Sequence, residues 1–257
     1  MKPILPAALA ALFFAASLLP CPAEEPPFTI KTDLSAAPQC AAFAEKAKTI
    51  AEEWYPKINT LLFGETRGLP ATEVTIEFKP MDGVAHAAGH KITISAEWVT
   101  EKQPDDYGMV VHELTHVVQN YRRRGNPGWL TEGIADYVRD RHYEPGKRSF
   151  RPNPVRSHYK QGYGITGAFL AWLEAEKDKD LVGKLNRACY EGQYKDALFE
   201  EYAGKPLDDL WREYVEATRR DRPQPQEKTA PPEATSGEPK EAPAPTAPGQ
   251  DTPAAGQ

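Results

Sequence analysis

The chain has 257 residues, with 31 lysine and arginine side chains against 37 aspartates and glutamates, and a formal net charge of −6. An acidic chain without a basic stripe does not match the electrostatic footprint of a nucleic-acid-binding protein, so we expect no nucleic-acid partner. The one basic run, Arg122-Arg123-Arg124, falls in a predicted loop and is interpreted as a solvated turn.

The N-terminal segment 1–23 reads MKPILPAALAALFFAASLLPCPA, a basic start followed by a mostly apolar run that ends at small residues. This pattern is typical of a secretory signal peptide. As a membrane anchor the run is short and is interrupted by Pro6. We therefore predict a secreted or periplasmic protein with no integral membrane segment after signal removal. A lipid anchor on Cys21 is the less favoured alternative, because Pro20 precedes it.

The first half of the remaining chain mixes strands with one helix. Residues 28–32 have strand character, and apolar residues at helical spacing predict a helix over 38–62, which Pro56 kinks or divides. Alternation of apolar and polar residues predicts strands over 73–78 and 89–95, the second preceded by a glycine- and alanine-rich bend.

The second half reads as helix, interrupted by a stop and restart at Gly125–Gly128 and by a loop over 145–154. A small sheet followed by a helical lobe predicts an α+β fold. The predicted helices are 106–122, 128–141, 164–177, 179–190, 194–202 and 206–218.

The C-terminal segment from Arg222 contains no aromatic residue and no aliphatic residue larger than alanine. It cannot bury enough apolar surface to offset the entropy of ordering, so we predict a disordered tail rich in Pro, Ala and Glu over 221–257. The domain prediction is thus a signal peptide, one folded domain over 24–220, and this tail. The oligomeric state stays open.

Two cysteines remain after signal removal, Cys40 and Cys189. An exported protein meets an oxidising environment, which allows a disulfide between them. Two buried thiols are the alternative, and the sequence leaves both open.

The segment VVHELTHVVQN places two histidines and a glutamate within a predicted apolar helix. Residues i and i+4 share a helix face, so His112 and His116 present their imidazoles side by side, as a zinc ion requires. Glu113 lies beside the pair, where it reaches a water molecule without binding the metal. The alternative without a metal is that the two histidines are buried in the core and hydrogen-bonded to neighbouring groups.

A third ligand favours the metal. The reversal after the first helix returns GWLTEGIADY alongside it, so Glu132 completes three protein ligands and leaves one position open for water, as catalytic zinc requires. Asp136, one turn later, is placed to accept a ring N–H from a zinc-binding histidine. Gly133 removes a side chain and is expected to let these two helices approach closely.

The segments HELTH and WLTEGIADY resemble the thermolysin-like (gluzincin) zinc metallopeptidases. The longer set of VHELTHVVQ, GWLTEGIADYVR, QGYGITGAFLAWLE and GKPLDDLWREYVEAT, within roughly 73–218, is similar to the basic secretory protein family of secreted peptidases. The resemblance implies a zincin-like fold in which the active-site helix follows a small N-terminal sheet. It also implies one zinc ion and a peptide or protein substrate.

The chemistry expected from this resemblance is hydrolysis by a zinc-activated water, with Glu113 as general base. The oxyanion needs a second hydrogen-bond donor. Tyr163 resembles the family's tyrosine at that place, and Tyr159, His158 and His142 are competitors.

A non-catalytic zinc-containing binding protein of the envelope or extracellular space is the alternative function, although a complete HExxH argues against a purely structural site. His86 and His90 flank the bend before the strand 89–95 and are interpreted as surface histidines. If that strand is the edge strand, an extended peptide can pair along it above the zinc.

Overall fold

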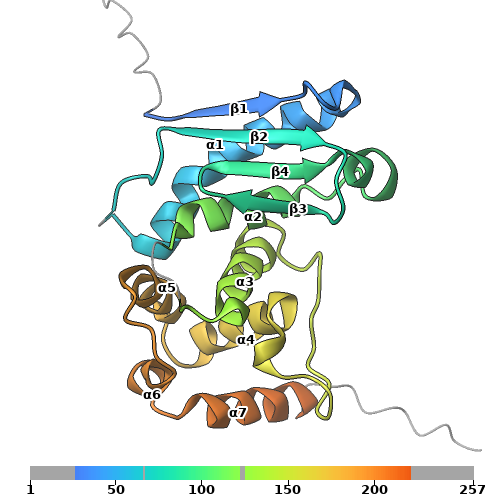
Figure 1. Cartoon of the computed structure of the whole chain (residues 1–257). Helices are drawn as coiled ribbons and strands as arrows, with labels where there is room; N and C mark the ends of the chain where they lie inside the picture. The colour runs from blue at the N-terminus through green and yellow to red at the C-terminus, as the bar shows by residue number, and fades with distance from the viewer. Residues whose placement is uncertain (1–26, 66, 122–124, 221–257) are drawn as a thin grey trace, which may run out of the picture. The chain divides into compact units, whose positions relative to one another are not determined.

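A four-stranded sheet forms the upper layer of the computed structural model, which describes residues 27–65, 67–121 and 125–220 (Figure 1). Helices α1 and α2 lie directly beneath the sheet, and α3 to α7 form the lower layers. The predicted signal peptide 1–23, the predicted tail 221–257 and the run Arg122–Arg124 lie outside the described residues. The α+β prediction, a small sheet followed by a mostly helical lobe, is confirmed.

The strand order is β1-β2-β4-β3. β1 (Thr29–Asp33) runs parallel to β2 (Glu73–Lys79), and β2 runs parallel to β4 (Lys91–Ser95). β3 (Ala85–Ala88) pairs antiparallel with β4 at the edge. Alternate side chains of β2 are buried, which is the pattern of a strand with one face on the core.

The prediction of a bend before the strand 89–95 was wrong, because part of the predicted bend is the strand β3. The strand at this edge of the sheet is β3 and not β4. Its sequence AHAA has none of the β-branched or aromatic residues that mark strands. Pairing with β4 makes it a strand. The two-residue connection begins at Gly89 with φ 60°, a conformation that hairpin turns assign to glycine.

The helix predicted over 38–62 consists of a short 3-10 helix, Pro38–Cys40, and α1, Ala41–Phe63. α1 connects two parallel strands, a connection that requires a crossover element. Pro56 lies inside α1 without dividing it. The carbonyl group four residues earlier loses its intrahelical partner, but Glu52 is exposed, so water can bind that oxygen.

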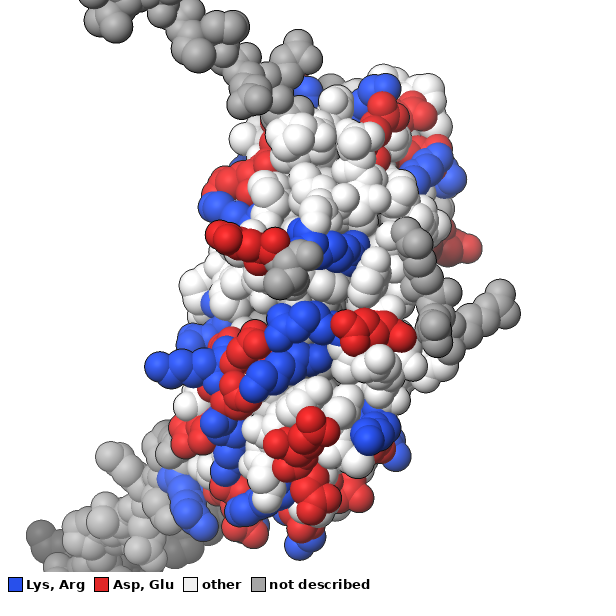
Figure 2. Space-filling view, turned by 90° about the vertical axis from the view of Figure 1, so that its left-hand side faces the viewer, with Lys and Arg blue, Asp and Glu red and all other residues white. Residues whose placement is uncertain are grey.

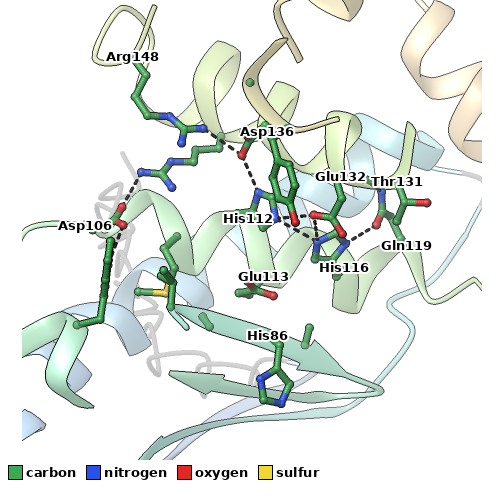
Figure 3. Close-up of a pocket in the computed structure, with 18 of the residues that line it drawn as sticks. His86, Asp106, His112, Glu113, His116, Gln119, Thr131, Glu132, Asp136 and Arg148 are labelled. Carbon is green, nitrogen blue, oxygen red and sulfur yellow. Dashed lines mark hydrogen bonds and ion pairs between the residues drawn. The ribbon is translucent and has the colours of Figure 1, made fainter. Parts of the chain in front are cut away.

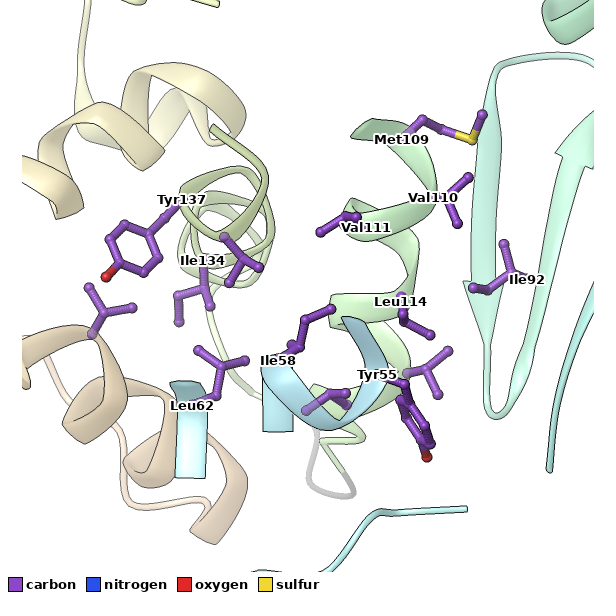
Figure 4. Packing of buried hydrophobic residues seen from close by; sticks show 14 of the residues in the cluster. Tyr55, Ile58, Leu62, Ile92, Met109, Val110, Val111, Leu114, Ile134 and Tyr137 are labelled. Carbon is purple, nitrogen blue, oxygen red and sulfur yellow. The ribbon is translucent and has the colours of Figure 1, made fainter. Parts of the chain in front are cut away.

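Helix α2 (Gly108–Gln119) lies between the sheet and the helical lobe, and all its residues except His116 are buried. Figure 4 shows Val110 pointing toward the strand that carries Ile92, and Val111 toward the helix that carries Ile134. α2 is shorter than the predicted 106–122 and ends at Asn120, whose left-handed conformation closes the last turn onto the His116 carbonyl.

The lobe follows the predicted helices closely, with one change. The helix predicted over 128–141 is α3 continued by a π-helix, in which each turn is wider. The observed bounds are α3 Gly128–Tyr137, π-helix Val138–Tyr143, 3-10 helix Tyr159–Gln161, α4 Tyr163–Glu176, α5 Leu181–Glu191, α6 Ala197–Ala203 and α7 Leu207–Arg220.

Gly133 allows a close approach, but the neighbour is α4 rather than α2 as predicted. A Cβ atom on Gly133 would lie 2.2 Å from the Cγ2 atom of Thr166. Gly167 faces back in the same way, since a Cβ there would lie 2.9 Å from the backbone nitrogen of Tyr137. The two glycines therefore set the spacing of α3 and α4.

Both described cysteines, Cys40 and Cys189, are buried free thiols, so the second of the two open alternatives is observed. Burial raises the pKa of each thiol, that of Cys189 to about 12. Neither is therefore a reactive thiolate at neutral pH.

On the face shown in Figure 2, basic and acidic side chains are interspersed rather than separated into patches of one sign. Many surface charges are paired, as in the bridges Lys184–Asp178 (2.5 Å) and Arg187–Asp180 (2.6 Å). Among the described residues, no helix combines the length and the apolar character needed to cross a membrane.

We expect Gly133→Ala to destabilise the protein. Thr166 is β-branched and donates its hydroxyl to the Tyr159 carbonyl, so it cannot turn away from an added methyl group. Overpacking of this kind costs about 1–3 kcal/mol, partly offset by the better helix propensity of alanine. Thermal unfolding of the purified domain measures the loss.

The control is the double variant Gly133→Ala with Thr166→Ser, which removes Cγ2 but keeps the hydroxyl. The double variant is compared with Thr166→Ser alone. In this background, Gly133→Ala is expected to lower the melting temperature less than it does in the wild type. An unchanged melting temperature in Gly133→Ala would show that α3 and α4 can separate without cost.

Candidate metal centre

The two histidines of α2 and a glutamate of α3 converge on one point (Figure 3). The Nε2 atoms of His112 and His116 are 3.2 Å apart. The Oε2 atom of Glu132 lies 3.2 Å from the first and 3.3 Å from the second. The sequence placed these residues together by helical spacing and chain reversal, and the structure brings them together.

These distances fit a zinc ion. With ligand bonds of about 2.0–2.1 Å and tetrahedral angles, two donor atoms of one zinc lie about 3.3 Å apart. Two imidazoles and a carboxylate are also the ligand types that zinc takes in catalytic sites. Among the described residues, this is the one group of three or more such side chains whose donor atoms approach closely enough to share an ion.

The electrostatics of the three side chains favour a positive charge. Burial opposes protonation of His112, but hydrogen bonds to Asp136 and Glu132 outweigh burial and raise its pKa to about 9. Burial likewise opposes ionisation of Glu132, yet its hydrogen bonds with both histidines lower its pKa to about 2. A site that stabilises a shared proton so strongly is also suited to a cation.

Glu113 lies next to this group but outside it. Its side chain is buried, and Figure 3 shows it between α2 and the strand that carries His86. Burial raises the pKa of its carboxyl group. Glu113 therefore lines the cleft but is not one of the three converging donors.

Asp136 accepts a hydrogen bond from the outer ring nitrogen of His112, with Nδ1 and Oδ1 2.7 Å apart. Burial opposes its ionisation, but this hydrogen bond and the charge of Arg148, 3.0 Å away, lower its pKa. Arg148 also forms two hydrogen bonds to Asp140 (2.6 and 3.0 Å). The contact between Asp136 and the histidine was predicted, whereas Arg148 was missed, because it lies in a loop with no periodic pattern.

His116 also has an outer partner, Gln119, that the sequence pattern did not predict. Its Nδ1 atom lies 2.7 Å from Oε1 of Gln119, and Nε2 of Gln119 donates to the Thr131 carbonyl at 3.0 Å. A signal was present, since Gln119 is three residues after His116 and so lies on the same helix face.

Tyr163 lines the cleft next to His112. Its ring stacks on that of His112, with centroids 6.1 Å apart and planes inclined by 11°. It is 57% exposed and has φ 48°, a left-handed conformation that is rare for an aromatic residue and costs about 1–3 kcal/mol. The charge of Glu132 and partial burial raise its pKa.

The competitors of Tyr163 are engaged elsewhere. Tyr159 is buried and donates to Asp208 at 2.7 Å. His158 accepts the Lys160 N–H as the cap of the 3-10 helix. The Nε2 atom of His142 lies 2.9 Å from the Tyr137 hydroxyl. Of the four candidates, Tyr163 alone lines the cleft.

The cleft has a volume of about 840 Å³, which is within the usual size of ligand sites. Strand β3 forms one wall, and α2, α3 and the start of α4 form the other. His86 in β3 and His90 in the following turn are both exposed, as predicted for surface histidines. The cleft-lining residues include Val84–Ala87, Trp98, Met109, Gln119, Thr131, Arg139, Arg148, Phe150 and Gly164.

Comparisons with solved structures find two-domain M1 zinc metallopeptidase variants, one bound to L-tryptophan and one to L-arginine. The first is 16% identical with a TM-score of 0.42, covering 63% of this chain and 42% of the other. The second is 15% identical with a TM-score of 0.35, covering 66% and 43%. This chain thus matches less than half of either structure. No curated protein matches significantly.

The model of a family described as "peptidase of plants and bacteria" (BSP) matches residues 33–214. This range contains β2, β3 and β4 but only the last residue of β1, together with all three converging donors and the glutamate beside them. It also covers well over half of the chain. The chain therefore belongs to the BSP family of peptidases.

Proposed function

We propose that this peptidase is zinc-dependent and that His112, His116 and Glu132 hold the ion. The observation that carries the proposal is the near-equal spacing of their three donor atoms, 3.2–3.3 Å, at the wall of a cleft. When bound there, zinc supplies a Lewis acid that polarises the scissile carbonyl group and lowers the pKa of a water molecule to about 7.

Glu113 is assigned the role of general base. Its carboxylate takes a proton from the attacking water, whose oxygen forms the new bond to the carbonyl carbon. The same proton then passes to the peptide nitrogen as the C–N bond breaks, which leaves a carboxyl product and an amine. The position of Glu113 beside the donors, rather than among them, supports this role.

Tyr163 is assigned the second donor to the oxyanion. Its hydroxyl carries a proton at neutral pH, since its pKa lies above the ordinary value. The ring stacked on His112 and the exposed position over the cleft support the assignment. Its left-handed backbone is the kind of strain that structures retain at functional sites.

Strand β3 is assigned the role of binding the substrate backbone. It pairs with β4 along one side, and its other side is an edge of the described sheet. An extended peptide adds to such an edge through main-chain hydrogen bonds. The cleft-lining side chains of Ala85 and Ala87 are small, so a peptide backbone has room to approach.

Export is part of the same proposal. It rests on the signal-peptide pattern of residues 1–23 alone.

The purified protein is expected to contain a single zinc ion, and Glu132→Ala is expected to lose it. Removing one of three ligands leaves two imidazoles, too few for a stable catalytic site. Elemental analysis after gel filtration measures the metal content. If wild-type protein retains no zinc after incubation with excess zinc salt and gel filtration, the metal site is ruled out.

Glu113→Gln is expected to keep zinc and to lower kcat by about 10²–10⁴-fold, the usual contribution of a general base. The amide has nearly the same shape but cannot accept the proton. Hydrolysis of a mixed peptide pool, followed by mass spectrometry, provides the rate. Zinc-loaded Glu113→Gln with full activity would remove this residue from the mechanism.

Tyr163→Phe is expected to lower kcat by about 10²–10³-fold with little change in KM, because the lost hydrogen bond forms in the transition state. Tyr159→Phe is the matched control, since that hydroxyl binds Asp208 away from the cleft. Equal kcat in the two variants would show that another group stabilises the oxyanion.

A further inference from the structure

The outer nitrogen of each histidine contacts a different kind of partner. For His112 the partner is the carboxylate of Asp136, which Arg148 also contacts. For His116 the partner is the neutral amide of Gln119, a side chain that is only 1% exposed. Figure 3 shows Gln119 between His116 and Thr131. The proposed mechanism gives this amide no part.

The contacts of Gln119 fix which way its amide points. The Thr131 carbonyl oxygen can only accept a hydrogen bond, so the NH₂ group of Gln119 must face it. The amide oxygen then faces His116, 2.7 Å from Nδ1. Because that oxygen can only accept, Nδ1 must carry the ring proton.

This proton position leaves the lone pair of the His116 ring on Nε2. That atom is the one that lies 3.3 Å from the Glu132 carboxylate and 3.2 Å from His112 Nε2. A backbone carbonyl of α3 thus determines, through one amide, which nitrogen of a histidine in α2 faces the donor cluster. Thr131 directly precedes Glu132, so the same contact ties the two ligand-bearing helices together.

We propose that Gln119 is a positioning residue, which holds His116 in the tautomer and orientation that binds zinc. The inference rests on the proposed zinc site. In this proposal, the neutral amide of Gln119 does for His116 what the carboxylate of Asp136 does for His112. His116 is therefore oriented without a further negative charge near the ion.

The test compares zinc affinity in Gln119→Met and in the wild type by competition with a chromophoric chelator. Loss of an outer partner typically lowers metal affinity 10–100-fold, and we expect a loss in that range. Asn59→Leu is the matched control. It also removes a buried amide, one that lies in α1 and donates to the Arg67 carbonyl at 2.7 Å, and it is expected to bind zinc like the wild type.

Gln119→Glu separates positioning from a merely structural role. Its carboxylate still accepts the Nδ1 proton but cannot donate to the Thr131 carbonyl. We expect near-wild-type zinc affinity together with a lower melting temperature of the metal-free protein. This variant also decides the matter if Gln119→Met does not fold.

Two results would overturn the inference alone, with wild-type zinc binding intact. They are wild-type affinity in folded Gln119→Met, and a tenfold or greater loss of affinity in Gln119→Glu, which keeps the acceptor. A wild-type chain that binds no zinc would overturn the proposed function and this inference together.

Discussion

The burial of helix α2 is the constraint on which the rest of the site depends. The sheet covers one side of this helix and the helical lobe covers the other, so its polar groups have little access to bulk water except where they line the cleft. An unpaired polar group in such a place costs several kcal/mol, and therefore each one needs a partner. Thr115 donates to the Val111 carbonyl, Gln119 to the Thr131 carbonyl, and the His112 ring contacts Asp136. The enclosure that makes the helix stable also fixes its imidazoles.

Charge is distributed unevenly around the two rings. Burial opposes ionisation of Asp136, but its hydrogen bond with His112 and the charge of Arg148 lower its pKa, and Arg148 is itself shared with Asp140. His116 contacts only a neutral amide on its outer side. Two neutral imidazoles and one carboxylate carry a single negative charge in total, so a divalent ion held by them would keep part of its positive charge. In the proposed mechanism, this remaining positive charge would polarise the scissile carbonyl group.

The sequence predicted the donor set well, because helical spacing and a glycine-marked reversal are local features. It predicted His112, His116 and Glu132 together for that reason, and the structure places their donor atoms within 4.8 Å of one another. It missed β3, whose alanines carry no strand signal until they pair with β4. It assigned Gly133 to the wrong helix neighbour, since spacing along the chain does not say which later helix packs there. Arg148 was not predictable, because a loop residue reaches Asp136 only through the folded path of the chain.

All three donors belong to one continuous stretch of chain, which runs from α2 through the reversal after it into α3. The opposite wall of the cleft comes from a separate stretch, the strand β3, which forms a hairpin with β4. Changes in length at a surface hairpin are tolerated, because closing a longer loop costs little free energy. Within one architecture, the groove can therefore widen, narrow or change its lining while the three coordinating atoms keep their mutual spacing.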